Sequence, residues 1–420
     1  MPRGIHYRVL LISCLVYAFA AMDTMLIGAL LVPIAKEWGL SRPEQGLLAS
    51  SGYVGMFLGA VTFGILADRI GRRNTMGITV AVFSLFTGLC GIASSLSEMI
   101  ILRFIAGIGL GGALPQPGVY TSEYAPERYR GMFLGLVETS WVYGALLAMF
   151  ISWIVVPFAG WRATFALGCL PLFLIPLLSL TPESMRYLIS SGRADVARDI
   201  ASRFGLSLPE VEVRKKAYTK CMADILGEKL RKRTLLLWIL WASLVYTYHG
   251  IFIWLPSIYY NMGIAYVKSI EFTLLVTLTQ IPGYYSATFL LDSVGRKKTL
   301  FVYLALAGIG SLMFATARDI PSILLYSCII SFFNLGSWAG LYAYTPELYP
   351  TEIRGFGSGT AAGVGRIAGI LAPYLTGVIW MEYGLETVFF VFSAVHMLAS
   401  ISTLILGIET KRRTLEELSR

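Results

Sequence analysis

Residues 64–73 read GILADRIGRR, and residues 292–298 read DSVGRKK, a shorter form of the same pattern. Each copy follows a long apolar stretch and places an aspartate before a glycine and a run of basic residues. More than half of the chain's length separates Asp68 from Asp292. A motif that recurs after such a distance, in the same sequence context, indicates that the chain contains two related halves.

A second motif repeats in the same order. Residues 126–131 read PERYRG, and residues 346–355 read PELYPTEIRG. The separation of Glu127 from Glu347 is close to that of the two aspartates of the first motif. Two different motifs at nearly one offset predict duplication of a whole unit. Internal repeats of this kind are common in transporters, which bind substrate where the halves meet.

The composition identifies what is repeated. The chain has 420 residues, of which 56% are hydrophobic and 14% charged, and its mean hydropathy is +0.68. These values exclude a soluble enzyme, a disordered regulator and a fibrous protein. Because a membrane-spanning helix needs about 20 apolar residues, the sequence predicts an all-α membrane protein with twelve spans in two pseudo-symmetric six-helix bundles. The predicted spans are 8–32, 45–67, 75–95, 98–122, 132–157, 161–181, 234–260, 271–291, 299–317, 321–345, 355–380 and 386–408.

Lysine and arginine give the orientation. With both termini in the cytoplasm, 27 of the 34 basic residues face that side, as the positive-inside rule requires. The net charge of +9 therefore reflects the orientation of the chain in the lipid bilayer, and no nucleic-acid partner is needed. The predicted domains are an N-terminal bundle, a cytoplasmic central loop that contains an amphipathic helix at 194–204, a C-terminal bundle and a cytoplasmic tail. Their bounds are 1–181, 182–233, 234–408 and 409–420.

These motifs, with the R-x-x-x-G-x-G-x-G-G run from Arg103 to Gly112, resemble those of the major facilitator superfamily. Residues 182–188, PESMRYL, resemble a signature of its sugar-porter and organic-ion branches, with Met185 in place of the usual proline. Four further segments resemble bacterial nicotinate transporters, and synaptic-vesicle glycoproteins share much of the pattern. They are GIFIWLP at 250–256, QIPGY at 280–284, FFNLGSW at 332–338 and YAYTPE at 342–347.

The resemblance implies a monomeric secondary transporter in the plasma membrane that works by alternating access. Its expected substrate is a small aromatic carboxylate such as nicotinate, taken up with protons. A sugar or organic-ion porter, or an exporter, remains a second interpretation, and a transport-inactive receptor a third. No set of catalytic residues, metal-ligand cluster or cofactor motif is present, and the five isolated cysteines fit a packing role.

In the superfamily the repeated motifs form a latch that closes the cytoplasmic side. Carboxylate and guanidinium groups can pair there, and glycines permit the tight turns. The alternative is that these charges only set the membrane orientation. The residues expected to take part in gating are Gly64, Asp68, Arg69, Gly71, Arg72, Arg73, Glu127, Arg130, Asp292, Gly295, Arg296, Glu347 and Arg354.

Ionisable residues inside a span are costly and therefore suggest a function. Asp23 and Arg103 match the acid–arginine pair of proton-coupled sugar porters, which implies that Asp23 accepts the coupled proton, although the two could form a static pair. Glu138 stands where sugar porters have a substrate-binding glutamine, so it could bind a proton or substrate. Arg366 could bind a carboxylate or pair with Glu138 across the halves.

Aromatic and amide side chains in the spans suggest a pocket for a small flat ring. His249 could carry a proton, stack on a ring or form part of the core, whereas His396 fits a structural role. Two prolines beside Gln116 predict a bend in the fourth span. The expected substrate-binding residues are Gln116, Glu138, Tyr246, Tyr248, His249, Gln280, Asn334, Trp338, Tyr342 and Arg366.

Overall fold

A computed structural model describes residues 4–208, 218–350 and 352–411, and every regular element in them is a helix. The all-α prediction is therefore confirmed. Parts of the predicted central loop and tail, at 209–217 and 412–420, lie outside the described residues.

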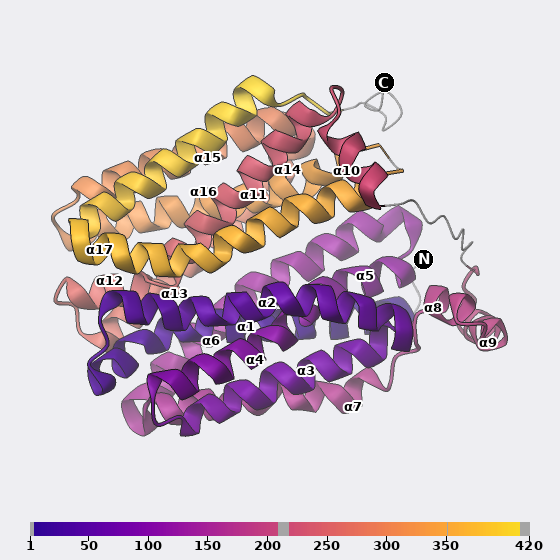
Figure 1. The fold of residues 1–420 in the computed structure, drawn as a ribbon, viewed down its shortest axis with the longest axis horizontal. Coiled ribbons are helices and arrows are strands. Elements are labelled where there is room, and N and C mark those ends of the chain that lie inside the picture. Colours follow the sequence, from indigo (N-terminus) through magenta and orange to yellow (C-terminus); the bar gives the residue numbers. More distant parts are fainter. Residues whose placement is uncertain (1–3, 209–217, 351, 412–420) are drawn as a thin grey trace. The chain divides into compact units, whose positions relative to one another are not determined.

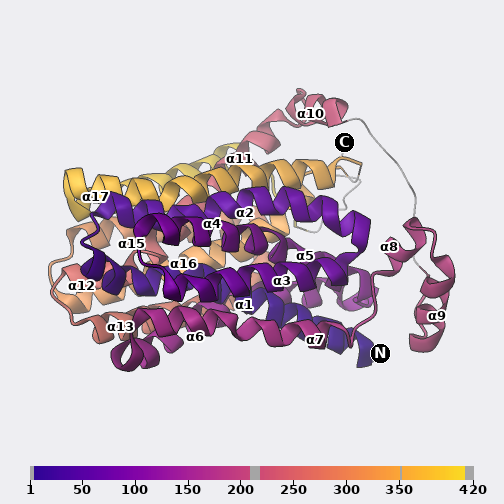
Figure 2. The same cartoon turned by 60° about the horizontal axis from the view of Figure 1, so that its bottom comes forward.

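The described chain divides into two compact units. The first comprises Met1–Gly39 and Ser51–Arg214, and the second comprises Leu40–Ser50 and Lys215–Arg420. In both views the long helices of each unit run side by side (Figures 1 and 2). The boundary in the central segment agrees with the repeat, since it leaves one copy of each motif in each unit.

Apart from the first residues of α2, the first unit contains the helices up to α9, together with three short 3-10 helices. They are α1 (Gly4–Trp38), α2 (Arg42–Ile70), α3 (Arg72–Leu89), η1 (Cys90–Ile92), α4 (Leu96–Ala113), α5 (Pro115–Tyr124), η2 (Glu127–Tyr129), α6 (Arg130–Ala166), η3 (Leu167–Phe173), α7 (Leu174–Leu178), α8 (Met185–Ser190) and α9 (Ala194–Phe204). α1 lies at the centre of this unit, where it contacts α3, α4, α5 and α6. Its residues from Ala20 to Val32 are all buried.

The second unit contains the remaining helices. They are α10 (Tyr218–Leu226), α11 (Arg231–Phe252), α12 (Leu255–Asn261), α13 (Tyr266–Leu278), α14 (Gln280–Ser293), α15 (Arg296–Thr316), α16 (Ile320–Glu347) and α17 (Arg354–Leu406). α11 packs against α16 and α17, and α15 packs against the same two helices. The polar and aromatic residues singled out in the sequence of this half lie on α11, α14, α16 and α17.

The helix pattern agrees with twelve spans. Within the described residues, nine helical segments are long and apolar enough to cross a membrane. Two of them, Glu127–Leu178 and Arg354–Leu406, each hold two predicted spans joined at a glycine. Gly160 has φ 77° and Gly384 has φ 85°, a backbone conformation that costs glycine little. One more predicted span is divided between α13 and α14.

Local sequence explains the other features of the first unit. The fourth span is divided into α4 and α5 at Leu114, next to the prolines that predict a bend, and Leu114 itself keeps helical dihedral angles. α4 contacts the backbone of α2 through its glycines, since a Cβ on Gly107 would lie 2.9 Å from the carbonyl carbon of Gly52. The amphipathic segment predicted at 194–204 is helix α9.

Candidate functional site

A buried ion pair lies inside the first unit. Arg103 of α4 donates from Nη1 to Asp23 Oδ1 of α1 at 2.6 Å, and the two side chains are 3% and 1% exposed. Thr87 of α3 donates its hydroxyl to the other carboxylate oxygen, Oδ2. Arg103 Nη1 also lies 3.4 Å from the Thr87 hydroxyl oxygen. The expected pair is therefore in contact, and Thr87 is a third member that the sequence did not single out.

Glu138 and Gln116, two other expected residues of this unit, lie on α6 and α5. Tyr17 of α1 donates its hydroxyl to Glu138 of α6 at 2.7 Å. The ring of Tyr17 also packs edge-on against Trp141, with centroids 6.2 Å apart. Gln116 is the second residue of α5 and is buried, and its Oε1 has no hydrogen-bond partner among the described residues.

Aromatic side chains of the second unit form a cluster that we call the aromatic cluster, made of Trp241, Trp338, Tyr342 and Tyr248. Trp241 of α11 meets Trp338 and Tyr342 of α16 edge-on, with centroids 5.7 and 5.6 Å apart. Tyr248 lies 6.3 Å from Trp338, again edge-on. Pairs of this geometry are favourable beyond the area they bury. Trp241 was not among the residues that the sequence suggested.

Polar groups border the aromatic cluster. Tyr248 donates its hydroxyl to Gln280 Oε1 at 3.3 Å. His249, the next residue of α11, places Nδ1 2.9 Å from the carbonyl of Val245. Arg366 lies on α17, which packs against α11. Gln280, Tyr248, Trp338 and Tyr342 are thus joined by direct contacts, either with one another or through Trp241.

Asn334 and Tyr246 have other neighbours. Asn334 of α16 is fully buried and donates to Thr247 Oγ1 at 3.0 Å and to His396 Nε2 at 2.9 Å. His396 Nδ1 lies 2.9 Å from the carbonyl of Phe392, so the imidazole is neutral, with the proton on Nδ1. This network joins α11, α16 and α17 and agrees with a structural role for His396. Tyr246 packs on Phe392 at 5.8 Å.

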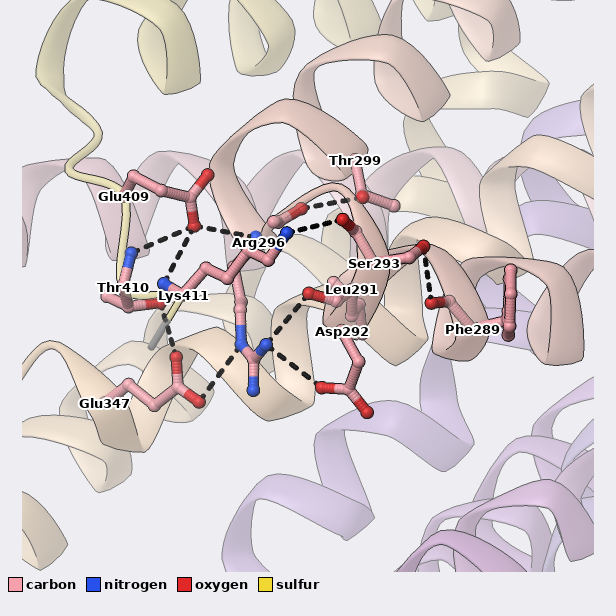
Figure 3. Close-up of polar contacts among 11 residues, drawn as sticks. Phe289, Leu291, Asp292, Ser293, Arg296, Thr299, Glu347, Glu409, Thr410 and Lys411 are labelled. Atoms are coloured by element: carbon pink, nitrogen blue, oxygen red, sulfur yellow. Dashed lines mark hydrogen bonds and ion pairs between the residues drawn. The ribbon is translucent and has the colours of Figure 1, made fainter. Parts of the chain in front are cut away.

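The repeated motif of the second unit forms a network centred on Arg296, which Figure 3 shows. Arg296 pairs with Asp292 at 3.0 Å and with Glu347 of α16 at 3.3 Å. Thr410 donates to the other oxygen of Glu347 at 2.5 Å. Glu409 accepts the backbone N–H groups of Arg296 at 2.9 Å and of Thr410 at 3.0 Å. We call this set the Arg296 network.

The first unit repeats the arrangement around Arg72. Arg72 pairs with Asp68 at 2.9 Å and with Glu123 of α5 at 3.5 Å, and Ser184 donates to the other oxygen of Glu123. Glu183 accepts the backbone N–H of Arg73 at 3.0 Å. This set is the Arg72 network.

The two networks correct the alignment of the second motif. Glu123, not Glu127, takes the place that Glu347 has in the second unit, and it precedes Glu347 by the same spacing that separates Asp68 from Asp292. Glu127 begins the short helix η2, and Arg130 is the first residue of α6. A strict search at the spacing of the aspartates would have found Glu123.

The capping residues Glu183 and Glu409 were also missed. Each accepts backbone N–H groups at the start of the helix that follows a glycine with positive φ, Gly71 at 98° and Gly295 at 123°. A carboxylate is favoured at a helix N-terminus. Both follow the sixth span of their unit, at nearly the spacing of the repeat, and this match in position was the available signal.

The remaining expected gating residues flank these networks. Arg69 accepts a hydrogen bond at its carbonyl from Tyr187 at 2.9 Å. Arg73 donates to the carbonyl of Thr181 at 3.0 Å, and Arg354 donates to the carbonyl of Tyr349 at 3.3 Å. A Cβ on Gly64 would meet open space, so no close approach requires a glycine there.

The described residues contain no group of three or more histidine, cysteine or acidic side chains that could hold a metal ion. The cysteines are free thiols. Apart from the Arg72 and Arg296 networks and the residues that flank them, the groups described above lie inside helical spans. A guanidinium, aromatic rings and a carboxylate have the chemistry to bind an anion, a flat ring and a proton.

Known proteins resemble this chain along most or all of its length. The niacin transporter NiaP of Acinetobacter baylyi is 38% identical over 100% of this chain and 98% of its own length. The benzoate transport protein of the same organism is 28% identical over 89% of this chain and 83% of its own length.

Solved structures show the same fold. A structure of the xylose transporter XylE from E. coli matches with a TM-score of 0.81 at 20% identity, over 98% of this chain and 100% of that chain. Another, described as a major facilitator superfamily proton:xylose symporter, matches with a TM-score of 0.73 at 21% identity, over 100% of this chain and 99% of that chain. A family model described as "Sugar (and other) transporter" matches residues 14–420. The chain therefore belongs to this transporter family and is a multi-pass membrane protein with the major facilitator fold.

Proposed function

We propose that the protein takes up nicotinate across the plasma membrane together with protons. The observation that carries this proposal is the match to a niacin transporter along the entire chain. The proposal places both termini in the cytoplasm, because most basic residues then face that side. The transporting species is a single chain, since each half already carries a complete copy of the repeated motifs.

The polar and aromatic groups of the second unit fit such a substrate. The aromatic cluster offers ring faces and edges to a flat ring, and Gln280 beside Tyr248 offers an amide. Arg366 offers a planar guanidinium that can bind a carboxylate through two parallel hydrogen bonds. A carboxylate that leaves water requires such a partner, because an unpaired buried charge is strongly unfavourable.

The buried pair of the first unit supports proton coupling. While Asp23 is ionised, Arg103 and Thr87 occupy both of its oxygens. A proton that arrives on the carboxylate removes its charge and weakens its hold on Arg103. The ion pair between Asp23 of α1 and Arg103 of α4 then weakens, and this links proton binding to a change in helix packing.

The Arg72 and Arg296 networks serve as the gating elements of this transporter. Each ties the end of one span to the segment after the last span of the same unit. Their aspartates, Asp68 and Asp292, are exposed, and ion pairs to exposed groups contribute little to stability. The Arg–Asp pairs therefore suit a contact that must open and close in each cycle.

Transport by the purified protein in liposomes tests the proposal. With an inward proton gradient we expect labelled nicotinate to accumulate above its external concentration, and a protonophore should abolish this accumulation. Excess benzoate and excess xylose serve as competitors that report the alternative substrate classes. Uptake of xylose without uptake of nicotinate would overturn the substrate assignment.

A further inference from the structure

Gln280 lies at the midpoint of the eighth predicted span. α13 has 13 residues and α14 has 14, and Thr279 joins them with helical dihedral angles, φ −67° and ψ −15°. Pro282 lacks a backbone donor in the first turn of α14, so the helical hydrogen bonding is weakened next to Gln280. Transporters commonly bind substrate near this depth of the membrane.

Only one of the two polar groups of the Gln280 side chain has a hydrogen-bond partner among the described residues. The residue is 1% exposed, and its Oε1 accepts the hydroxyl of Tyr248 at 3.3 Å. Its Nε2, which carries two N–H donors, has no hydrogen-bond partner among the described residues. Reversing the amide would leave Oε1 in the same unsatisfied position. A buried donor without an acceptor is costly, and a methionine would fill a similar volume without that cost.

The orphaned donor adjoins the aromatic cluster. Tyr248, which donates to Gln280 Oε1, packs edge-on against Trp338 with ring centroids 6.3 Å apart. The centroid of the Tyr248 ring also lies 4.7 Å from that of Phe252. Arg366 stands on α17, which packs against α11, the helix that carries Tyr248. A flat anion held here would therefore have ring contacts, a cation for its carboxylate and, at Gln280, a hydrogen-bond donor for an acceptor elsewhere on the molecule.

We propose that Gln280 donates from Nε2 to the ring nitrogen of a bound pyridine carboxylate and so selects it over a benzene carboxylate. This inference rests on the proposed function. The pyridine nitrogen has an in-plane lone pair that is unprotonated near neutral pH and accepts one hydrogen bond. Benzoate has the same shape and charge but presents a C–H group there, which leaves the buried amide unsatisfied. Sites built around a polar group of the substrate reject analogues that lack it.

Equilibrium binding to the purified protein tests this assignment. For the wild type we expect nicotinate to bind at least tenfold more tightly than benzoate. For Gln280→Met we expect nicotinate to lose about tenfold in affinity, while benzoate changes less than twofold. Thr288→Val is the matched control. Thr288 is an exposed residue of the same helix, and its hydroxyl donates to the carbonyl of Tyr284. Its replacement should leave both affinities unchanged.

The outcomes separate the inference from the function on which it rests. If the wild type binds neither acid, the proposed function fails. If the wild type binds nicotinate, and Gln280→Met lowers the affinities for both acids equally or changes neither, Gln280 does not contact the ring nitrogen. Only the inference then fails. Should Gln280→Met not fold, the wild type still decides, because equal affinities for nicotinate and benzoate would overturn the assignment.

Discussion

At the scale of single residues, Thr87 contacts the carboxylate that we propose as the proton acceptor. Its hydroxyl donates to Asp23 Oδ2, and it can accept in return once that oxygen is protonated, because a hydroxyl is both donor and acceptor. Arg103 on α4 donates to the other oxygen of this carboxylate.

Substitution of Thr87 by valine tests this role. Valine keeps the shape but removes the hydroxyl that donates to Asp23 Oδ2. A buried carboxylate oxygen then loses its donor, so we expect proton-driven accumulation of nicotinate to fall in Thr87→Val. Thr87→Ser keeps the hydroxyl and should restore accumulation to the wild-type level. Accumulation that is unchanged in Thr87→Val would mean that Thr87 only fills space.

Arg366 gives the second prediction at this scale. If its guanidinium binds the carboxylate, Arg366→Lys keeps the charge but loses the planar fork, so nicotinate should bind less tightly. Arg366→Ala should nearly abolish the binding of nicotinate and affect nicotinamide much less. Paired binding isotherms for the acid and the amide provide the measurement. Equal losses for both ligands would show that Arg366 maintains the structure and does not contact the carboxylate.

At the scale of helices, the starts of α3 and α15 depend on a glycine and a distant glutamate. Gly295 has φ 123°, and a Cβ there would lie 2.6 Å from the carboxyl carbon of Glu409. Gly295→Ala should therefore destabilise the protein by about 1–3 kcal/mol, measured as a lower Tm in detergent. Gly359→Ala, in α17 with open space around it, is the control and should not lower the Tm. An unchanged Tm in Gly295→Ala would contradict this account.

The sequence predicts these helices well because their signals are local. Apolar runs, glycine and proline breaks and the amphipathic pattern of α9 all act within a few turns. The partners of the networks could not be found in that way. Glu183 reaches the backbone of Arg73 from 110 residues away, and Thr87 reaches Asp23 from 64. Such contacts depend on how the helices pack, and only the strict spacing of the repeat pointed to Glu123.

At the scale of the whole molecule, the two units differ in their buried polar groups. The buried acid–arginine pair lies in the first unit, whereas the aromatic cluster, Gln280 and Arg366 lie in the second. The Arg72 and Arg296 networks, by contrast, form a matching pair, one in each unit. The two units therefore share the contacts proposed for gating and differ in the buried groups. If Asp23 takes up the proton and the second unit binds the substrate, as proposed, the two events must be coupled, and a single substitution can break that coupling.

Asp23→Asn should break that coupling. Asparagine has the size of a protonated aspartate and carries no charge, so it holds the first unit permanently in its protonated form. We expect the variant to exchange internal for external nicotinate at a rate near that of the wild type, since exchange needs no net movement of protons. Accumulation driven by a proton gradient should be lost. Asp195→Asn, on the exposed face of α9, is the matched control and should preserve both activities. Accumulation in Asp23→Asn that still follows the proton gradient would show that another group carries the proton.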